Sequence, residues 1–275
     1  MSDFVFPFAD IGELVKIAVR AGQIVMQHYQ SSTLGIFKKS DHSPVTDADR
    51  EAHRFIHTSL LQLTPHTPVL SEEGEHIPYE ARKAWETFWL VDPLDGTQEF
   101  IGRTGHFAVC IGLIHQNYPV AGAVYLPAIQ ELFFADGKQS FKMLLNGTTV
   151  RLQLPHQPLQ TPWRAVCSKG KMPEQDRAFL WQNWGINRAT PMGSALKYCA
   201  LAEGKADIFY RTRGNSEWDS AAGQAVLEQA GGHILAMNGE RFSYNKPSLV
   251  NPPFVCLGFS DKQAVMPALQ AAGAQ

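Results

Sequence analysis

The chain has 275 residues, of which 44% are hydrophobic and 18% charged; this is a globular composition, long enough for one large domain or two lobes that share a core. Lysine and arginine number 24 against 26 aspartate and glutamate residues, so neither charge is in strong excess. This balance argues against proteins whose main activity is to coat nucleic acid or anionic lipid.

Cysteine usage and the N-terminal sequence bear on the cellular compartment. The sequence MSDFVFPFADIGELVK has neither a basic leader nor a long apolar core, and no stretch reaches the roughly 18 apolar residues that a membrane span needs. We therefore expect no signal peptide, no transmembrane segment and a cytoplasmic location. The cysteines show no CxxC spacing and lie mostly in apolar surroundings, so we expect free buried thiols at Cys110, Cys167, Cys199 and Cys256.

The first part of the chain is expected to be mainly helical. From Asp10, a capping pair is followed by apolar residues at helical spacing, which predicts a helix over about residues 10–30. After a loop, a second helix is expected from Asp47 to Leu63, where acidic residues suit the start of a helix. The stretch TPVLSEEGE predicts a short strand over residues 67–71 that ends on acids.

The middle of the chain predicts an antiparallel sheet, and the last part predicts alternating strands and helices. Two apolar strands flank Asn117 and Tyr118, and ELFFA at residues 131–135 is a third. After the stretch RLQLPHQPLQTPW, the strands RAVCS, GINRAT and ADIFY alternate with the helices PEQDRAFLWQNW, SALKYCALAEG and EWDSAAGQAVLEQAGG. We therefore expect an N-terminal α+β lobe, residues 1–155, and a C-terminal α/β lobe, residues 156–275.

Three acidic clusters lie at the ends of predicted elements, and each has an ordinary interpretation beside a metal-binding one. Glu72 and Glu73 follow the strand TPVL, where solvated loop charges are common. Asp92 and Asp95 follow the strand WLV, which we expect to end there in a turn. Asp219 fits an S-x-x-D capping box at the start of the last large helix. Several carboxylates from different segments would also suit a hard cation such as Mg²⁺.

The DPLDGT stretch favours the metal-binding interpretation. A plain turn requires neither both carboxylates nor the threonine that follows them. The proline stiffens the backbone, so that Asp92 and Asp95 can face one point together with the carbonyl of Leu94. If a helical turn begins here, the amides of Gly96 and Thr97 point outward and form an anion site. A metal beside such amides suits a phosphate ester.

Two motifs together, DPLDGTQEF and WDSAAGQAVLEQAGG, resemble the inositol-monophosphatase superfamily of magnesium-dependent, lithium-sensitive phosphatases. SPVTDAD and VLSEE also fit, so the resemblance runs from about residue 10 to the C-terminus. The versions PVLSEE, GSALKYCALAEGKAD and SEWDSAAGQAVLE are most similar to the CysQ branch, the 3'(2'),5'-bisphosphate nucleotidases. The resemblance implies an α/β (α+β) fold, a layered αβαβα sandwich of the inositol-monophosphatase and sugar-phosphatase type.

The same resemblance assigns the site residues motif by motif. It places catalysis on Asp49, Thr97 and Glu72, with Thr97 oriented by Asp49 to hold and deprotonate the attacking water. Two or three Mg²⁺ ions are implied, with the ligands Glu72, Asp92, the Leu94 carbonyl, Asp95 and Asp219. Substrate contacts are expected from Glu72, Leu94, Asp95, Gly96, Thr97, Ser194, Lys197 and Asp219.

Residues of the second lobe are expected to set specificity. The amides at Ser194, which opens a predicted helix, are candidates for a phosphate or a ribose hydroxyl. Lys197, Arg211 and Arg213 are candidates for a second phosphate, and a solvated surface role is equally open for each. Tyr198 either stacks on the base or is a core aromatic, and the core role is the stronger expectation.

The activity implied is Mg²⁺-dependent removal of the 3'-phosphate of adenosine 3',5'-bisphosphate, a by-product of sulfate assimilation, to give AMP and phosphate. The alternative is an inositol or sugar monophosphatase. A binding protein without catalysis is disfavoured, because every acid that the metal site needs is present. The expected partner is a small nucleotide bisphosphate and not a nucleic acid. A homodimer and peripheral attachment to the cytoplasmic face of the inner membrane are left open.

Overall fold

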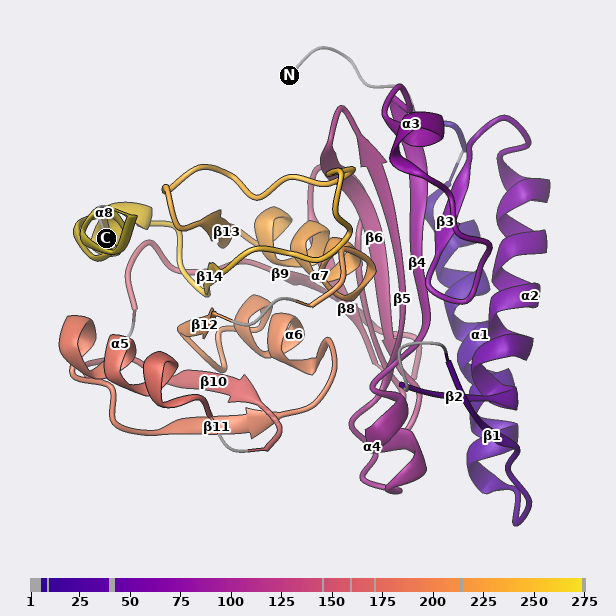
Figure 1. Cartoon of the computed structure of the whole chain (residues 1–275), viewed down its shortest axis with the longest axis horizontal. Coiled ribbons are helices and arrows are strands. Elements are labelled where there is room, and N and C mark those ends of the chain that lie inside the picture. The colour runs from indigo at the N-terminus through magenta and orange to yellow at the C-terminus, as the bar shows by residue number, and fades with distance from the viewer. Residues whose placement is uncertain are drawn as a thin grey trace.

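Two large β-sheets alternate with three layers of helices across the molecule (Figure 1). The order of the layers is helix, sheet, helix, sheet, helix, which confirms the αβαβα sandwich expected from the sequence. The computed structural model describes residues 6–8, 10–39, 43–144, 146–158, 160–170, 172–212 and 215–273.

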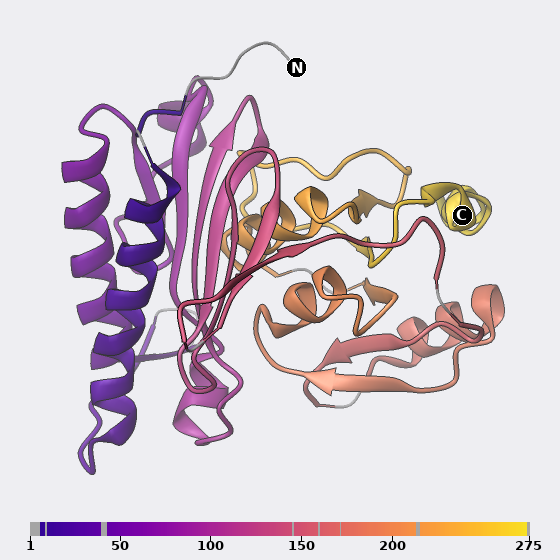
Figure 2. The ribbon, with the colours of Figure 1, turned by 180° about the vertical axis from the view of Figure 1, so that it is seen from behind.

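The first helical layer consists of α1 (Ile11–Gln30) and α2 (Asp47–Leu63), which pack together on one face of the larger sheet (Figure 2). The side chain of Asp10 caps α1, and a capping box that includes Asp49 starts α2. Each helix buries one apolar stripe against the sheet. Both helices predicted for this part of the chain are confirmed.

The larger sheet has seven strands, which are antiparallel to their neighbours except for the parallel pair β3–β4. In sheet order they are β3 (Val69–Ser71), β4 (Thr87–Asp95), β5 (Ala108–His115), β6 (Tyr118–Leu126), β7 (Glu131–Ala135), β8 (Ser140–Met143) and β9 (Thr149–Leu152). The predicted strands from TPVL to ELFFA are confirmed, whereas β8 and β9 lie outside the prediction. So does a separate antiparallel hairpin of β1 (Ile36–Lys38) and β2 (Pro44–Thr46).

The smaller sheet has five strands and is mixed, because β10 pairs in parallel with β11 and β12 while β14 is antiparallel to β12 and β13. In sheet order the strands are β11 (Ala189–Met192), β10 (Ala165–Ser168), β12 (Ile208–Arg211), β14 (Phe254–Leu257) and β13 (His233–Ala236). The helices between the two sheets are α6 (Leu196–Ala202) and α7 (Trp218–Gln229). Those on the outer face are α5 (Glu174–Trp184) and α8 (Met266–Gly273). The shorter elements of the described chain are α3 (Tyr79–Arg82), α4 (Thr97–Ile101) and η1 (Lys262–Ala264).

Two glycines of the larger sheet allow α7 to lie close to it. A Cβ on Gly122 of β6 would lie 3.0 Å from the Cα of Ala222, and a Cβ on Gly112 of β5 would lie 3.1 Å from the Cβ of Ala221. Because these strand positions carry no side chain, the helix backbone approaches the sheet closely. This close packing also brings α7 into contact with β4.

Three expectations about the chain as a whole can be compared with the fold. One hydrophobic core joins both sheets through α6 and α7, so the division into residues 1–155 and 156–275 stays a prediction. The four cysteines are buried and free, as expected. Within the described stretches, no helix is both long enough and apolar enough to cross a membrane.

Candidate active site

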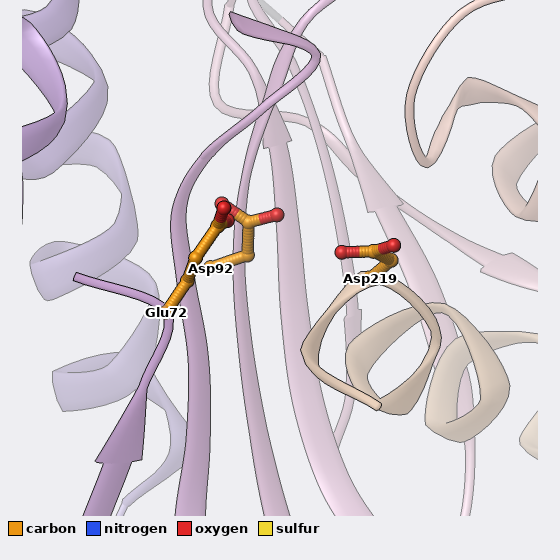
Figure 3. Close-up of side chains that lie close together, drawn as sticks. All are labelled: Glu72, Asp92 and Asp219. Atoms are coloured by element: carbon orange, nitrogen blue, oxygen red, sulfur yellow. The ribbon is translucent and has the colours of Figure 1, made fainter. Parts of the chain in front are cut away.

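Carboxylates from three separate segments meet where the larger sheet faces α7. Glu72, Asp92 and Asp219 each offer one oxygen, and these oxygens all lie within 4.8 Å of one another. Figure 3 shows Asp92 on β4, Glu72 on the segment that follows β3, and Asp219 at the start of α7. We call these three residues the acidic centre. Across the described residues, no other group of His, Cys, Asp and Glu side chains converges in this way.

The backbone of β4 explains how two of these carboxylates come together. The strand continues to Asp95, so the expectation that it ends after WLV is wrong. Its register against β5 shifts between Asp92 and Asp95, because the proline between them has no amide to donate to the ladder. The amide of Glu72 donates to the carbonyl of Val91 at 3.0 Å and so prolongs the β3–β4 pairing. Glu72, directly after β3, and Asp92, on β4, are therefore held side by side.

The turn that follows β4 has the form predicted from DPLDGT. Gly96 has φ 91°, in the left-handed region that glycine adopts without steric cost. The helical turn α4 then starts at Thr97, as expected. A Cβ on Gly96 would lie 2.9 Å from the carbonyl oxygen of His106 and 3.2 Å from the Cβ of Ser194, so the site requires glycine here on two grounds.

The acidic centre is electrostatically unfavourable without a cation. Burial raises the pKa of Asp92 well above its ordinary value, and the neighbouring negative charges of Glu72, Asp95 and Asp219 add to the effect. Burial likewise raises the pKa of Asp219 well above its ordinary value, with further contributions from Asp95 and Glu72. Like charges at this separation cannot all be ionised cheaply in a buried site. A bound cation would relieve the repulsion.

Asp219 makes one contact of the predicted capping box, although the N-cap residue of α7 is Glu217, and its role as a metal ligand stays a prediction. Its Oδ2 accepts a hydrogen bond from the amide of Ser216 at 2.9 Å, which is the contact of a helix cap. The carboxylate also belongs to the acidic centre. The cap interpretation and the ligand interpretation are therefore compatible, because a carboxylate has two oxygens.

Asp95 lies beside the acidic centre and is bonded to the second part of the chain. Its Oδ2 accepts a hydrogen bond from the hydroxyl of Ser194 at 2.7 Å. Burial raises the pKa of Asp95, while the positive charge of Lys197 and the bond from Ser194 oppose the rise. Ser194 thus contributes its hydroxyl to a carboxylate, whereas its amide was the expected substrate contact. The roles of Asp95 as a ligand and of Ser194 as a substrate contact stay predictions.

Thr97 and Asp49 are brought together, as the motifs suggest. The Thr97 hydroxyl lies 3.1 Å from Asp49 Oδ1 and 3.2 Å from the carbonyl oxygen of Leu94, and it can donate to either. The other oxygen of Asp49 accepts from the amide and the hydroxyl of Thr46, at 2.7 and 2.6 Å. Burial raises the pKa of Asp49, although these hydrogen bonds oppose the rise.

Lys39, which follows β1, was not identified from the sequence and contacts the acidic residues directly. Its Nζ lies 2.6 Å from Glu72 Oε1 and 2.5 Å from Glu73 Oε1. Burial alone would lower the pKa of Lys39, but the two carboxylates outweigh burial and raise it. Burial raises the pKa of Glu73 to about 7, against the opposing charge of Lys39. No local pattern marks this lysine, because the contact joins residues far apart in the chain.

A cavity of about 200 Å³ lies beside the acidic centre, and both acidic and basic residues line it. Its walls include Asp95, Gly96, Ser194, Lys197, Arg211 and Asp219. Lys197 is buried, and its Nζ donates to the carbonyl of Ser194 at 2.6 Å. Burial lowers the pKa of Lys197, the charge of Asp95 opposes this effect, and the charge of Arg211 adds to it. Two cations therefore lie near each other in this part of the cavity.

The other candidate residues of the second lobe have different surroundings. Tyr198 is 2% exposed and packs in the core between the sheets, so the expectation of a core aromatic is confirmed. Arg213 lies outside the described residues. A larger cavity of about 340 Å³ lies between α5 and β11, but no carboxylate lines it. Of these two cavities, only the smaller one is lined by a residue of the acidic centre, Asp219.

The donor set fits Mg²⁺. Carboxylate oxygens are the ligands that this hard cation prefers, and it usually takes few of them while it keeps several waters. The acidic centre supplies such oxygens from three segments, with the strongly buried Asp92 at its middle. The carbonyl of Leu94 and the carboxylate of Asp95 lie next to it along β4 and are the other expected ligands.

Comparison with known proteins points the same way. The sequence profile of the inositol monophosphatase family matches residues 10–270. A 3'(2'),5'-bisphosphate nucleotidase CysQ of Salmonella typhimurium is 38% identical over 244 residues, which cover 88% of this chain and 97% of the relative. The corresponding protein of Escherichia coli K12 is 37% identical over 246 residues, with 89% of this chain and 98% of the relative covered.

Solved structures agree with the fold. The crystal structure of CysQ from Bacteroides thetaiotaomicron, a bacterial member of the inositol monophosphatase family, has a TM-score of 0.74 at 34% identity and covers 90% of this chain and 96% of that one. The IMPase of Thermotoga maritima has a TM-score of 0.74 at 23% identity, with 96% and 98% covered, and supports the fold alone.

The raised carboxylate pKa values predict how metal-free stability depends on pH. Between the ordinary pKa and the raised one, the folded protein holds protons that the unfolded chain has released, so stability falls as pH rises through this window. For Glu73 the window runs from 4.5 to about 7. Each pKa unit corresponds to about 1.4 kcal/mol, or roughly 2–4 °C in Tm for a chain of this size.

We therefore expect the Tm in EDTA to be lower at pH 8 than at pH 5.5, and Mg²⁺ to raise it more at pH 8. Thermal unfolding under the four conditions measures this. Asp219→Asn is the matched variant, and it should be more stable than the wild type in EDTA at pH 8 and gain less from Mg²⁺. An equal effect of Mg²⁺ at both pH values, with Asp219→Asn no different from the wild type, would contradict the expectation.

Proposed function

Because the chain belongs to the inositol monophosphatase family, we propose that it is a Mg²⁺-dependent 3'(2'),5'-bisphosphate nucleotidase. It hydrolyses the 3'-phosphate of adenosine 3',5'-bisphosphate and gives AMP and phosphate. The observation that carries this proposal is a cavity beside the acidic centre that is lined by Lys197 and Arg211 as well as by Asp95 and Asp219. A substrate with two phosphates finds both cations and carboxylates in such a cavity.

Two or three Mg²⁺ ions would be held by Glu72, Asp92, Asp95, Asp219 and the carbonyl of Leu94. When bound there, Mg²⁺ would neutralise the charge of the scissile phosphate and lower the pKa of a bound water molecule. That water could then lose a proton and attack phosphorus. The residues of the chain then have to orient the water, accept its proton and hold the rest of the substrate.

Thr97 and Asp49 act on the attacking water. The Thr97 hydroxyl donates a hydrogen bond to Asp49 Oδ1, 3.1 Å away, so its oxygen can accept a hydrogen bond from the water. As the water attacks, its proton passes to Thr97 and the proton of Thr97 passes to Asp49. Asp49 is fixed by Thr46, and its raised pKa makes it a better base than an exposed aspartate. Glu72, next to this pair, is the expected third catalytic residue.

Lys197 and Arg211 bind the second phosphate. Burial lowers the pKa of Lys197 and the charge of Arg211 adds to this effect, which a dianion bound beside them would oppose. Arg211 is held in place by its Nη1, which donates to the hydroxyl of Ser168 at 3.0 Å. The ester thus has one orientation, with the scissile phosphate at the acidic centre and the other phosphate at Lys197 and Arg211.

We further propose a cytoplasmic location, since free cysteines persist in a reducing compartment. A homodimer and peripheral attachment to the inner membrane stay predictions.

Substrate choice tests the proposed function. We expect a much higher kcat/KM for adenosine 3',5'-bisphosphate than for inositol 1-phosphate, measured by released phosphate. Arg211→Gln should lower kcat/KM for the bisphosphate by about 10- to 100-fold, because hydrogen bonds to charged groups contribute about 1.5–3 kcal/mol. The same substitution should change hydrolysis of adenosine 3'-monophosphate little, since that ester has no second phosphate.

Arg188→Gln is the matched control, because Arg188 lines the other cavity and its loss removes the same charge. It should leave both substrates unaffected. Equal kcat/KM values for the bisphosphate and inositol 1-phosphate would contradict the nucleotidase proposal and favour a phosphatase of the inositol or sugar type. Equal losses on both adenosine esters in Arg211→Gln would remove Arg211 from the second-phosphate site.

The proposed role of Thr97 makes a separate prediction. Thr97→Ala should lower kcat by about 10²–10⁴-fold, the usual contribution of general-base assistance, with Mg²⁺ affinity nearly intact. Thr97→Ser keeps the hydroxyl and should keep most of the activity. Single-turnover kinetics and calorimetric Mg²⁺ titration measure the two quantities. Loss of Mg²⁺ binding with unchanged kcat at saturating Mg²⁺ would make Thr97 a metal-site residue instead.

A further inference from the structure

Asp219 is carried by a turn whose position depends on a distant part of the chain. We call residues 215–220 the Asp219 turn. The carboxylate of Asp219 has a bond to the amide of Ser216, which lies within the same turn and cannot fix it relative to β4. The charges of Asp95 and Glu72 repel Asp219, so contacts with the rest of the chain have to hold the turn in place. The packing of α7 on the larger sheet, the bond from the amide of Glu217 to the carbonyl of Leu249 at 2.8 Å and the bridge between Ser216 and Val250 are three of them.

Asn251, just before β14, contacts the Asp219 turn on both sides of Asp219. Its backbone amide donates to the carbonyl of Asn215 at 2.7 Å. Its side-chain Nδ2 lies 3.1 Å from Asn215 Oδ1, 3.0 Å from the carbonyl oxygen of Ser216 and 2.9 Å from Ser220 Oγ. Asn251 is 2% exposed, so water does not replace these bonds readily. One amide group thus joins the residues before Asp219 to the residue after it.

Asn251 also contacts an ion pair between Lys246 and the fully buried Glu217. Lys246 Nζ lies 3.3 Å from Asn251 Oδ1 and 2.6 Å from Glu217 Oε1. Glu217 is fully buried, and its carboxylate also accepts from the amides of Asn245 and Lys246, at 2.8 and 3.0 Å. The segment from Asn245 to Asn251 and the Asp219 turn therefore form one connected polar network, in which every bond is made between buried or half-buried groups.

We propose that Asn251 is a positioning residue, which holds Asp219 at the distance from Glu72 and Asp92 that Mg²⁺ binding requires. The inference rests on the proposed function, because it assumes that the acidic centre binds the metal. Partners that orient metal ligands typically change metal affinity by about 10- to 100-fold when they are removed. Asn251 touches neither the acidic centre nor the cavity, and it acts only through the turn.

A second buried asparagine provides a matched control. Asn245 is 6% exposed, its Nδ2 donates to the carbonyl of Arg82 at 2.8 Å, and its Oδ1 accepts from Arg82 Nη1 at 2.7 Å. Its side chain therefore fixes α3 and not the Asp219 turn. Asn251→Leu removes four side-chain hydrogen bonds. Asn245→Leu removes two and also places leucine at φ 61°, in the left-handed region that it adopts only at a cost, so both variants should lower stability.

The experiment measures Mg²⁺ affinity by calorimetry, unfolding by urea in EDTA, and phosphate release at low and saturating Mg²⁺. Asn251→Leu should bind Mg²⁺ about 10- to 100-fold more weakly, and saturating Mg²⁺ should restore most of its kcat. Asn245→Leu should lose comparable stability and keep the Mg²⁺ affinity of the wild type. Wild-type Mg²⁺ affinity in Asn251→Leu, or an equal loss in both variants, would overturn the proposal.

A smaller change covers the case in which Asn251→Leu does not fold. Ser220→Ala removes one acceptor of the Asn251 amide, and it should weaken Mg²⁺ binding in the same direction but less. Unchanged Mg²⁺ affinity in that variant would likewise count against Asn251. A wild-type protein that binds Mg²⁺ but releases no phosphate would refute the proposed function and leave the positioning role to be decided by the affinities alone.

Discussion

The site depends on a fold that holds three mutually repelling carboxylates close together, those of Glu72, Asp92 and Asp219. Asp92 lies on β4, Glu72 directly follows the neighbouring strand β3, and Asp219 lies at the start of a helix from the other half of the chain. A fold held together only locally would let them separate. Here the glycines that admit α7 to the larger sheet, and the polar network around Asn251, keep them close. The resulting excess of negative charge is what a divalent cation would neutralise.

The same constraint orders the rest of the cavity. Lys197 of α6 and Arg211 of β12 line the cavity together with Asp95 and Asp219, so cations and carboxylates are close together there. The ammonium group of Lys39 contacts the carboxylates of Glu72 and Glu73 and partly balances their negative charge. A cation that binds at Glu72 competes with this lysine, which makes metal binding and the position of the β1–β2 hairpin interdependent.

Much of this could be predicted from local patterns. The helical repeat after Asp10, the apolar strands of the larger sheet and the turn at Gly96 each follow from residues within a few positions of one another. The continuation of β4 to Asp95 could not be predicted in this way, because its pairing with β5 keeps the strand going past a proline. Lys39 and Asn251 act through partners 31 or more residues away, as the separations of their hydrogen bonds show. Such contacts leave no periodicity in the sequence.

The most direct test of the account is the location of the metal. Crystals soaked in Mn²⁺, which takes oxygen ligands as Mg²⁺ does, would show it by anomalous scattering. The account predicts a peak in contact with the carboxylates of Glu72, Asp92 and Asp219, with the Lys39 ammonium withdrawn from Glu72. A peak elsewhere, or an acidic centre without one while Lys39 stays on Glu72 at saturating Mn²⁺, would contradict it.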